Sequence, residues 1–230
     1  MQTRIGTSGY SYPAWKGAFY PKDLPARKML EYYATQLSTV EINNTFYRMP
    51  SAKLVQSWAD GVPDGFTFAI KAPQQITHRL RLKDAGEATA ALLAAVELLA
   101  EKQGPILFQL PPFVKKDVPL LSAFLAEMPK RCRAAFEFRH ESWFADDTYQ
   151  ALGAVDAALC IADGDKLSVP LQATAKWGYL RLRREDYVES DIRDWAKKIS
   201  AQPWQEAFVY FKHEDEGKGP RLAAMLRSLM

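Results

Sequence analysis

Polar side chains that could carry chemistry recur at the ends of five apolar segments. They alternate with apolar neighbours in Val40-Glu41-Ile42-Asn43 and in Phe136-Glu137-Phe138-Arg139. Because the side chains of a strand alternate between its two faces, we expect the apolar members to face a helix layer and the polar members the opposite side. The same alternation gives an inward direction to four further residues, which are Lys71, Gln109, Arg181 and Arg183.

These residue types suit a site for a small anionic substrate. Charge-assisted hydrogen bonds to a phosphate or carboxylate would come from Lys71, Arg139 and Arg181. Glu41 or Glu137 would act as general base, and His78 as the acid or proton shuttle. The catalytic candidates are therefore Glu41, Lys71, His78 and Glu137, in a hydrolase, lyase or isomerase. A competing interpretation is a polar plug whose charges only neutralise one another.

A divalent-metal enzyme, either a hydrolase or isomerase or a nucleic-acid-processing protein, is an alternative for the same residues. Glu41, His78, Glu137 and Asp163 offer ligands from different segments, and their oxygen atoms favour magnesium or manganese while the histidine leaves zinc open. The adjacent lysine and arginines would compete with a cation. Metal dependence stays open, and the chain has no nucleotide-cofactor motif. His213-Glu214-Asp215 is interpreted as a solvated loop.

Aromatic residues in the connecting segments could stack on bases or sugars, and they are Trp15, Phe46, Tyr47, Trp143 and Trp177. A non-catalytic ligand-binding or nucleic-acid-binding module is therefore a third interpretation. The net charge of +3 falls well short of a dedicated nucleic-acid binder, and the same aromatics could instead cap the core. The substrate-binding candidates are Trp15, Asn43, Tyr47, Gln109, Arg139, Trp143, Asp163 and Arg181.

Strand-like runs alternate with helical patterns along the whole chain. The expected strands cover residues 3–7, 39–42, 66–71, 105–110, 134–138, 157–162, 178–182 and 207–211. Helical spacing is clearest over 87–103 and 118–128. Eight units in 230 residues leave about 29 residues for each, which predicts one (β/α)8 barrel domain over residues 1–230. Residues 163–177 contain Gly164 and Pro170, so the helix after the sixth strand is expected to be absent or very short.

The barrel places the candidate residues together, because barrel chemistry is assembled at the C-terminal ends of the strands. An open doubly wound sheet would usually carry a glycine-rich phosphate turn after the first strand, and GTSGYSYP does not match it. Hydrophobic residues make up 48% of the chain and no apolar stretch approaches the ~20 residues of a membrane span. We therefore expect a cytoplasmic protein with no membrane partner, in which Cys132 and Cys160 are free thiols.

Five segments in order carry a resemblance to a known family. They are GTSGYSYPAWKGAFYP (residues 6–21), TVEINNTFYRMP (39–50), GFTFAIKAP (65–73), ILFQLPP (106–112) and FEFRHESW (136–143). Together they resemble the domain-of-unknown-function family seventy-two, the YecE-like proteins, over nearly the whole chain. The resemblance implies a TIM-type barrel and supplies no reaction.

The resemblance also marks shared positions, which include Glu41, Asn43, Tyr47, Lys71, His78, Gln109, Glu137, Arg139, Trp143 and Asp163. Two segments depart from the family pattern. Relatives resemble Arg-x-His-Gly after the seventh strand, where this chain reads Arg181-Leu182-Arg183-Arg184. After the eighth strand relatives often carry an asparagine-rich turn, where this chain reads Phe211-Lys212-His213-Glu214. The resemblance therefore implies no role for these two loops.

Overall fold

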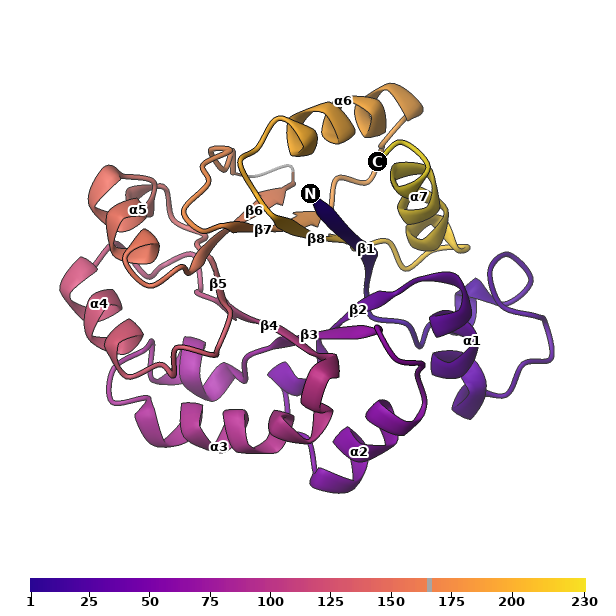
Figure 1. Cartoon of the computed structure of the whole chain (residues 1–230), viewed down its shortest axis with the longest axis horizontal. Coiled ribbons are helices and arrows are strands. Elements are labelled where there is room, and N and C mark those ends of the chain that lie inside the picture. The colour runs from indigo at the N-terminus through magenta and orange to yellow at the C-terminus, as the bar shows by residue number, and fades with distance from the viewer. Residues whose placement is uncertain (165–166) are drawn as a thin grey trace.

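Eight parallel strands close into a barrel in the computed structural model, which describes residues 1–164 and 167–230 (Figure 1). The strands are β1 (Gln2–Ser8), β2 (Thr39–Ile42), β3 (Thr67–Lys71), β4 (Gln103–Gln109), β5 (Ala134–Glu137), β6 (Ala158–Asp163), β7 (Trp177–Leu182) and β8 (Glu206–Phe211). The barrel closes where β1 pairs with β8 from Gln2 with Glu206 to Thr7 with Phe211. The predicted (β/α)8 fold class is confirmed.

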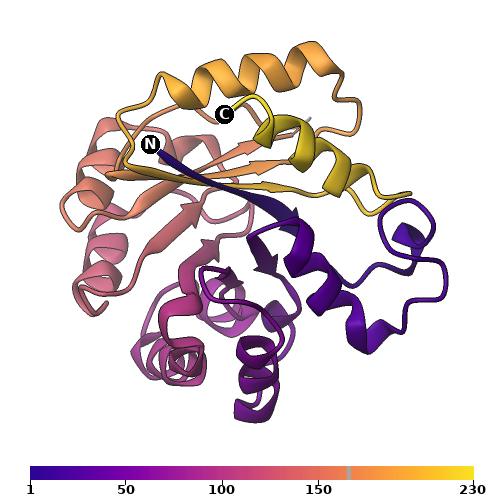
Figure 2. The ribbon, with the colours of Figure 1, turned by 45° about the vertical axis from the view of Figure 1, so that its right-hand side comes forward.

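Helices surround the barrel on its outside (Figures 1 and 2). The α-helices are α1 (Met29–Gln36), α2 (Ala52–Asp60), α3 (Gly86–Val96), α4 (Val118–Ala126), α5 (Asp146–Gly153), α6 (Glu189–Ser200) and α7 (Lys218–Arg227). Short 3-10 turns cover Pro13–Trp15, Ala26–Lys28, Asn44–Phe46, Glu97–Lys102 and Glu141–Trp143, and Gln75–Arg79 forms a π-helical turn. None of the helices in the described part of the chain has the length and apolar character to cross a membrane.

The connection from β6 to β7 contains no helix among its described residues, as its glycine and proline predict, and residues 165–166 of that loop lie outside the described residues. Thr174 ties the returning segment to β6. Its Oγ1 accepts a hydrogen bond from Leu159 N at 2.8 Å and donates one to the Ala157 carbonyl at 2.8 Å. These bonds satisfy backbone groups at a place where no helix covers the strand.

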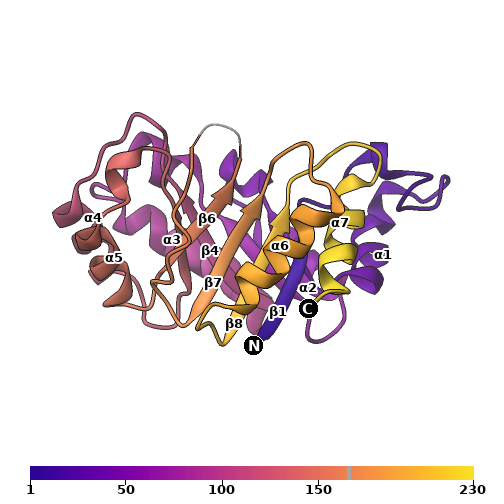
Figure 3. The same ribbon diagram turned by 90° about the horizontal axis from the view of Figure 1, so that it is seen from above.

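The barrel interior is filled below the candidate site. Its apolar layer consists of Ala69, Leu107, Ala135, Ala158, Cys160, Trp177, Tyr179, Phe208 and Tyr210. At the N-terminal ends of the strands Arg4 Nε donates to Glu206 Oε1 at 2.6 Å, and Arg133 pairs with the other carboxylate oxygen. Figure 3 shows the chain's N-terminus on this lower side of the barrel. Packing and ion pairs therefore fill the lower barrel, and the site lies at the opposite mouth.

Close contact between β1 and β2 depends on a glycine. A Cβ added at Gly6 would lie 2.0 Å from the Thr39 carbonyl oxygen, which no side chain can occupy. Thr7 pairs with Val40 and Ser8 pairs with Glu41 in the same two strands. The missing side chain therefore lets β1 present Ser8 beside the carboxylate of Glu41.

Candidate active site

Two carboxylates and one arginine form a buried ion-paired cluster at the C-terminal mouth. Arg181 of β7 donates from Nη2 to Glu41 Oε1 of β2 at 2.9 Å and from Nη1 to Glu137 Oε2 of β5 at 2.6 Å. The side chains of both glutamates are fully buried and that of Arg181 is 3% exposed. One guanidinium thus joins strands from separate parts of the barrel, with one hydrogen bond from each Nη atom to a different carboxylate.

The carboxylate of Glu41 is held by four donors in all. Besides Arg181, these are Ser8 Oγ at 2.6 Å, Tyr179 OH at 2.6 Å and Asn43 Nδ2 at 3.0 Å. Burial alone would raise the pKa of Glu41, but Arg181 and these hydrogen bonds together hold it below its ordinary value. Glu41 is therefore ionised at neutral pH.

Glu137 is held in the same manner on the other side of Arg181. Gln109 Nε2 donates to its Oε2 at 2.8 Å, and Arg139 Nε donates to its Oε1 at 3.1 Å. Arg183 Nη2 lies 3.4 Å from the same Oε1. Burial raises the pKa of Glu137, but the three arginines and Gln109 outweigh it and hold the pKa well below its usual range.

The many hydrogen bonds that Glu41 and Glu137 accept make them poor candidates for the general base. A carboxylate with a lowered pKa attracts a proton weakly, and the oxygens of both glutamates already accept hydrogen bonds. The geometry therefore disfavours the expectation that Glu41 or Glu137 is the base. Their contacts suit them instead to fixing Arg181 and Arg139 in place.

Lys71 lies against an aromatic ring, whereas the arginines of the mouth pair with glutamates. Its Nζ lies 4.3 Å from the centroid of the Phe46 ring and has no hydrogen-bond or ion-pair partner among the described residues. Burial, and then the repulsion of Arg181, lower the pKa of Lys71 from 10.5 to about 8, although Glu41 and Glu137 oppose the change.

The free energy that corresponds to the lowered pKa of Lys71 is larger than the energy of its contact with the Phe46 ring. A fall from 10.5 to about 8 corresponds to about 3 kcal/mol. A cation over an aromatic ring gains only about 0.5–1 kcal/mol at partly exposed sites. The contact with the Phe46 ring stabilises the charged form of Lys71. This effect is smaller than that of burial and the arginines, which favour the neutral form, so the pKa of Lys71 stays near 8.

His78 lies on the same side of the mouth, in the π-helical turn after β3. Its ring centroid is 4.8 Å from that of Phe46, and its Nδ1 lies 2.9 Å from Thr77 Oγ1. Burial first, and then Lys71 and Arg139, lower the pKa of His78. A neutral imidazole beside Lys71 can accept or relay a proton.

Among the described residues, the ion-paired cluster with Lys71 has more cations than carboxylates. Four cations, Lys71, Arg139, Arg181 and Arg183, surround two carboxylates. The side chains of Arg139 and Arg183 are 37% and 24% exposed, so both reach solvent. The buried Nε atoms of Arg181 and Arg183 have no partner among the described residues. Guanidinium groups with free donors are the groups that bind phosphate and carboxylate.

Asp163 lies outside this cluster, which corrects its assignment to substrate or metal binding. Asp163 pairs in register with Leu182, whereas Ala162 pairs with Arg181. The carboxylate of Asp163 consequently points to the helix layer, where Oδ2 accepts hydrogen bonds from Tyr187 OH at 2.6 Å and Trp195 Nε1 at 3.1 Å. Its contacts attach β6 to α6.

Three tryptophans proposed for ligand stacking belong to the core. Trp15 is 0% exposed and Trp143 1%, and Trp143 stacks on Phe138 with ring centroids 4.4 Å apart. Trp177 begins β7 at the far end of the barrel. These positions correct the expectation that Trp15 and Trp143 bind substrate and that Trp177 lies at the mouth. Tyr47 remains 77% exposed beside Phe46.

The proposed metal ligands do not assemble. Within residues 1–164 and 167–230, no three His, Cys, Asp or Glu side chains are grouped so that they could hold a metal ion. The oxygens of Glu41 and Glu137 are occupied by protein donors, and Asp163 faces elsewhere. His213 is also buried rather than solvated, and its Nε2 lies 2.7 Å from the Arg184 carbonyl oxygen. The donor set therefore fits an arginine cluster better than a metal.

Two members of the cluster were not named as site residues from the sequence, although Arg183 was expected to face inward. Tyr179 donates to Glu41, and Arg183 contacts Glu137. Both lie two residues from Arg181, so the period-two alternation that gave Arg183 its inward direction applies equally to Tyr179. From the sequence, however, Tyr179 between Gly178 and Leu180 is interpreted as a core residue. Its hydrogen bond to Glu41 becomes evident only from the structure.

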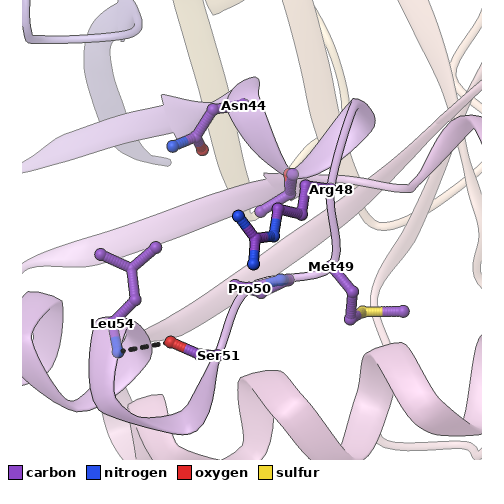
Figure 4. Close-up of a pocket in the computed structure, with 7 residues that line it drawn as sticks. Asn44, Arg48, Met49, Pro50, Ser51 and Leu54 are labelled. Atoms are coloured by element: carbon purple, nitrogen blue, oxygen red, sulfur yellow. Dashed lines mark hydrogen bonds between the residues drawn. The ribbon is translucent and has the colours of Figure 1, made fainter.

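A hollow of about 410 Å³ lies beside the mouth, between the end of β2 and α2 (Figure 4). It is lined by Asn44, Thr45, Arg48, Met49, Pro50, Ser51 and Leu54. Thr45 connects it to β3, because its Oγ1 donates to the Lys71 carbonyl at 2.7 Å. None of the ion-paired residues lines this hollow, so it is adjacent to the charged cluster and separate from it.

Known proteins are similar to this chain in sequence or in structure. YecE of Escherichia coli K12, a UPF0759 protein, is 30% identical over 142 residues, which are 61% of this chain and 50% of YecE, so the chain spans about half the length of this curated relative. YunF of Bacillus subtilis 168, another UPF0759 protein, is 23% identical over 87% of this chain and 86% of YunF. The crystal structure of a DUF72 family protein from Thermotoga maritima MSB8 has a TM-score of 0.89 and 25% identity, covering 100% of this chain and 99% of that one. The family model "Protein of unknown function DUF72" matches residues 4–230, and the chain belongs to the DUF72 family.

Proposed function

We propose that this protein is an enzyme that acts on a small anionic substrate at the C-terminal mouth of the barrel, with Lys71 as its proton-transferring group. One observation carries the proposal. Lys71 is half-buried and has no carboxylate partner among residues 1–164 and 167–230, in a mouth where the neighbouring arginines are held by two ionised glutamates. An amine in this setting titrates near neutral pH, which is what acid–base catalysis requires.

The protonation state of Lys71 supports this role. With a pKa of about 8, roughly one amine in ten is neutral at pH 7, against fewer than about one in a thousand for an ordinary lysine. The neutral amine can take a proton and the ammonium can return it. His78, on the same Phe46 ring, supplies a second group for the proton.

The arginines supply binding. Arg139 and Arg183 each contact Glu137 and also reach solvent, so their remaining donors can hold a phosphate or carboxylate group. Arg181 is buried between the glutamates and holds the arrangement together. A substrate bound to Arg139 and Arg183 would lie at the opening where Lys71 also ends its strand.

A non-catalytic receptor for small anions is the second candidate. It is favoured by the saturation of Glu41 and Glu137, which leaves the site with only one strongly perturbed amine. The two functions share a ligand class and differ in whether Lys71 is needed for binding or for turnover.

The experiment is a screen of phosphorylated and carboxylated metabolites, first for a shift in melting temperature and then for consumption followed by NMR. We expect at least one anion to be consumed, and Lys71→Met to lower the rate by about 10²–10⁴-fold while retaining binding. Lys197→Met is the matched control, because Lys197 is 80% exposed on α6. Binding without turnover in the wild type would favour the receptor, and equal rates for the wild type and Lys71→Met would exclude Lys71 from the chemistry.

A further inference from the structure

We propose that Lys71 forms a covalent imine with an anionic aldehyde or ketone bound at the mouth. This inference rests on the proposed function and deepens it, because it names the substrate class as a carbonyl compound that also carries a phosphate or carboxylate. Lysine amines that lack an ion pair and titrate near neutral pH are the ones that attack carbonyl carbons in proteins.

The surroundings of Lys71 keep its amine available. The oxygens of both nearby glutamates are committed to Arg181, Arg139 and neutral donors, so neither is free to fix the lysine as an ammonium ion in a salt bridge. The Nζ atom rests instead against the face of Phe46 at 4.3 Å. An aromatic face leaves the nitrogen lone pair without a hydrogen-bond donor that would compete with an electrophile.

The arginines explain why the carbonyl compound should be anionic. Arg139 and Arg183 converge on Glu137 Oε1 from two strands, at 3.1 and 3.4 Å, and both remain partly exposed. A phosphate or carboxylate can occupy these donors while the rest of the molecule extends to Lys71, which would hold a carbonyl carbon near the amine.

The chemistry balances without an oxidant or reductant. The lone pair of neutral Lys71 forms a bond to the carbonyl carbon, the π electrons move to oxygen, and the proton lost from nitrogen is returned to that oxygen. The carbinolamine then loses its hydroxyl group with one proton as water, which leaves the imine. His78 is placed beside the same ring to relay this proton. The protonated imine is an electron sink for a following lyase or isomerase step.

The test traps the imine with a chemical probe. The protein is incubated with pyridoxal 5′-phosphate, or separately with pyruvate, and then reduced with sodium borohydride, which converts an imine into a stable secondary amine. Peptide mass mapping locates the product. We expect one adduct per chain on Lys71, at least tenfold faster than on any other lysine, and protection by excess inorganic phosphate. Pyridoxal, which lacks the phosphate, is expected to label Lys71 at least tenfold more slowly.

The controls separate this inference from the proposed function. Lys71→Met should lose the adduct and Lys197→Met should keep it. In the wild type alone, labelling of Lys71 should rise with a midpoint near pH 8, so the test does not depend on a variant that folds. If both probes label Lys71 no faster than exposed lysines, the imine is overturned. In that case phosphate-dependent stabilisation that is lost in Arg139→Gln would leave the proposed function standing, and its absence would remove both.

Discussion

At the scale of single residues, the site contains the glutamates and arginines, which stay charged at neutral pH, and Lys71, whose charge can change. The alternation of polar and apolar residues predicted an inward direction for Glu41, Glu137 and Arg181, and the structure brings them together. Which charge would stay unpaired could not be predicted, because pairing depends on distances between strands. The distinct position of Lys71 follows only from its neighbours in three dimensions.

Replacing Glu137 tests whether its charge holds the arginines. Glu137→Gln keeps the shape and removes the charge that faces Arg139, Arg181 and Arg183. Breaking a buried pair in this way costs about 3–5 kcal/mol, so the midpoint of thermal unfolding should fall by about 6–20 °C. Glu97→Gln, whose partner Arg131 is exposed, should change stability by less than about 0.5 kcal/mol. An effect no larger than that of the control would contradict the role of Glu137.

The lowered pKa of Lys71 predicts a pH-dependent effect on stability. Below pH 8 the lysine is charged in both states, and the folded state bears the cost of a buried charge. Between pH 8 and 10.5 the unfolded chain binds more protons than the folded one, so this cost disappears as the pH rises. Lys71→Met should therefore raise the free energy of unfolding by about 1–3 kcal/mol at pH 7 and by much less at pH 10.

Urea unfolding at pH 7, 9 and 10 measures this difference. Titration of the other groups cancels when the variant is compared with the wild type at each pH. Lys197→Met, on the surface of α6, should show no pH dependence of this kind. A constant difference between Lys71→Met and the wild type across this range would mean that the amine titrates normally.

At the scale of secondary structure, strand positions were predictable and two details were not. The helix expected over residues 87–103 ends at Val96. It is followed by a 3-10 turn over Glu97–Lys102, in which Ala100 has a φ of 47°, and β4 begins at Gln103. Apolar spacing does not distinguish the two helix types. The run of apolar residues in β6 likewise hides the direction of Asp163, since no polar neighbour marks the inner face.

The connection between β6 and β7, in which the described residues form no helix, depends on Thr174. Thr174→Val keeps the size and removes the hydroxyl that bonds both Ala157 and Leu159. Leaving these backbone groups unpaired should cost about 1–3 kcal/mol. Thr35→Val is the control, because Thr35 is exposed on α1 and its hydroxyl bonds only locally, to the Tyr32 carbonyl and to Gln36 Nε2. Equal stabilities of the two variants in urea unfolding would show that water replaces the Thr174 bonds.

At the scale of the whole molecule, charge is arranged unequally between the two ends of the barrel. The lower end pairs Arg4 and Arg133 with Glu206, and the described ion-paired cluster at the mouth, taken with Lys71, has more cations than carboxylates. The net charge of +3 gives no hint of this separation. It arises because the barrel collects the first residues of each strand at one end and the last residues at the other.

Arg133 and Arg139 flank the same strand, β5, and so test which end binds anions. We expect inorganic phosphate to raise the melting temperature of the wild type by about 5–10 °C at a hundred times its dissociation constant. Arg139→Gln should lose most of this increase. Arg133→Gln should lower stability without phosphate, because it breaks the pair with Glu206, and yet keep the full increase. Higher ionic strength should reduce the effect at the partly exposed mouth. Loss of the phosphate effect in Arg133→Gln but not in Arg139→Gln would place the anion at the lower end and contradict a site built on Lys71 and its arginines.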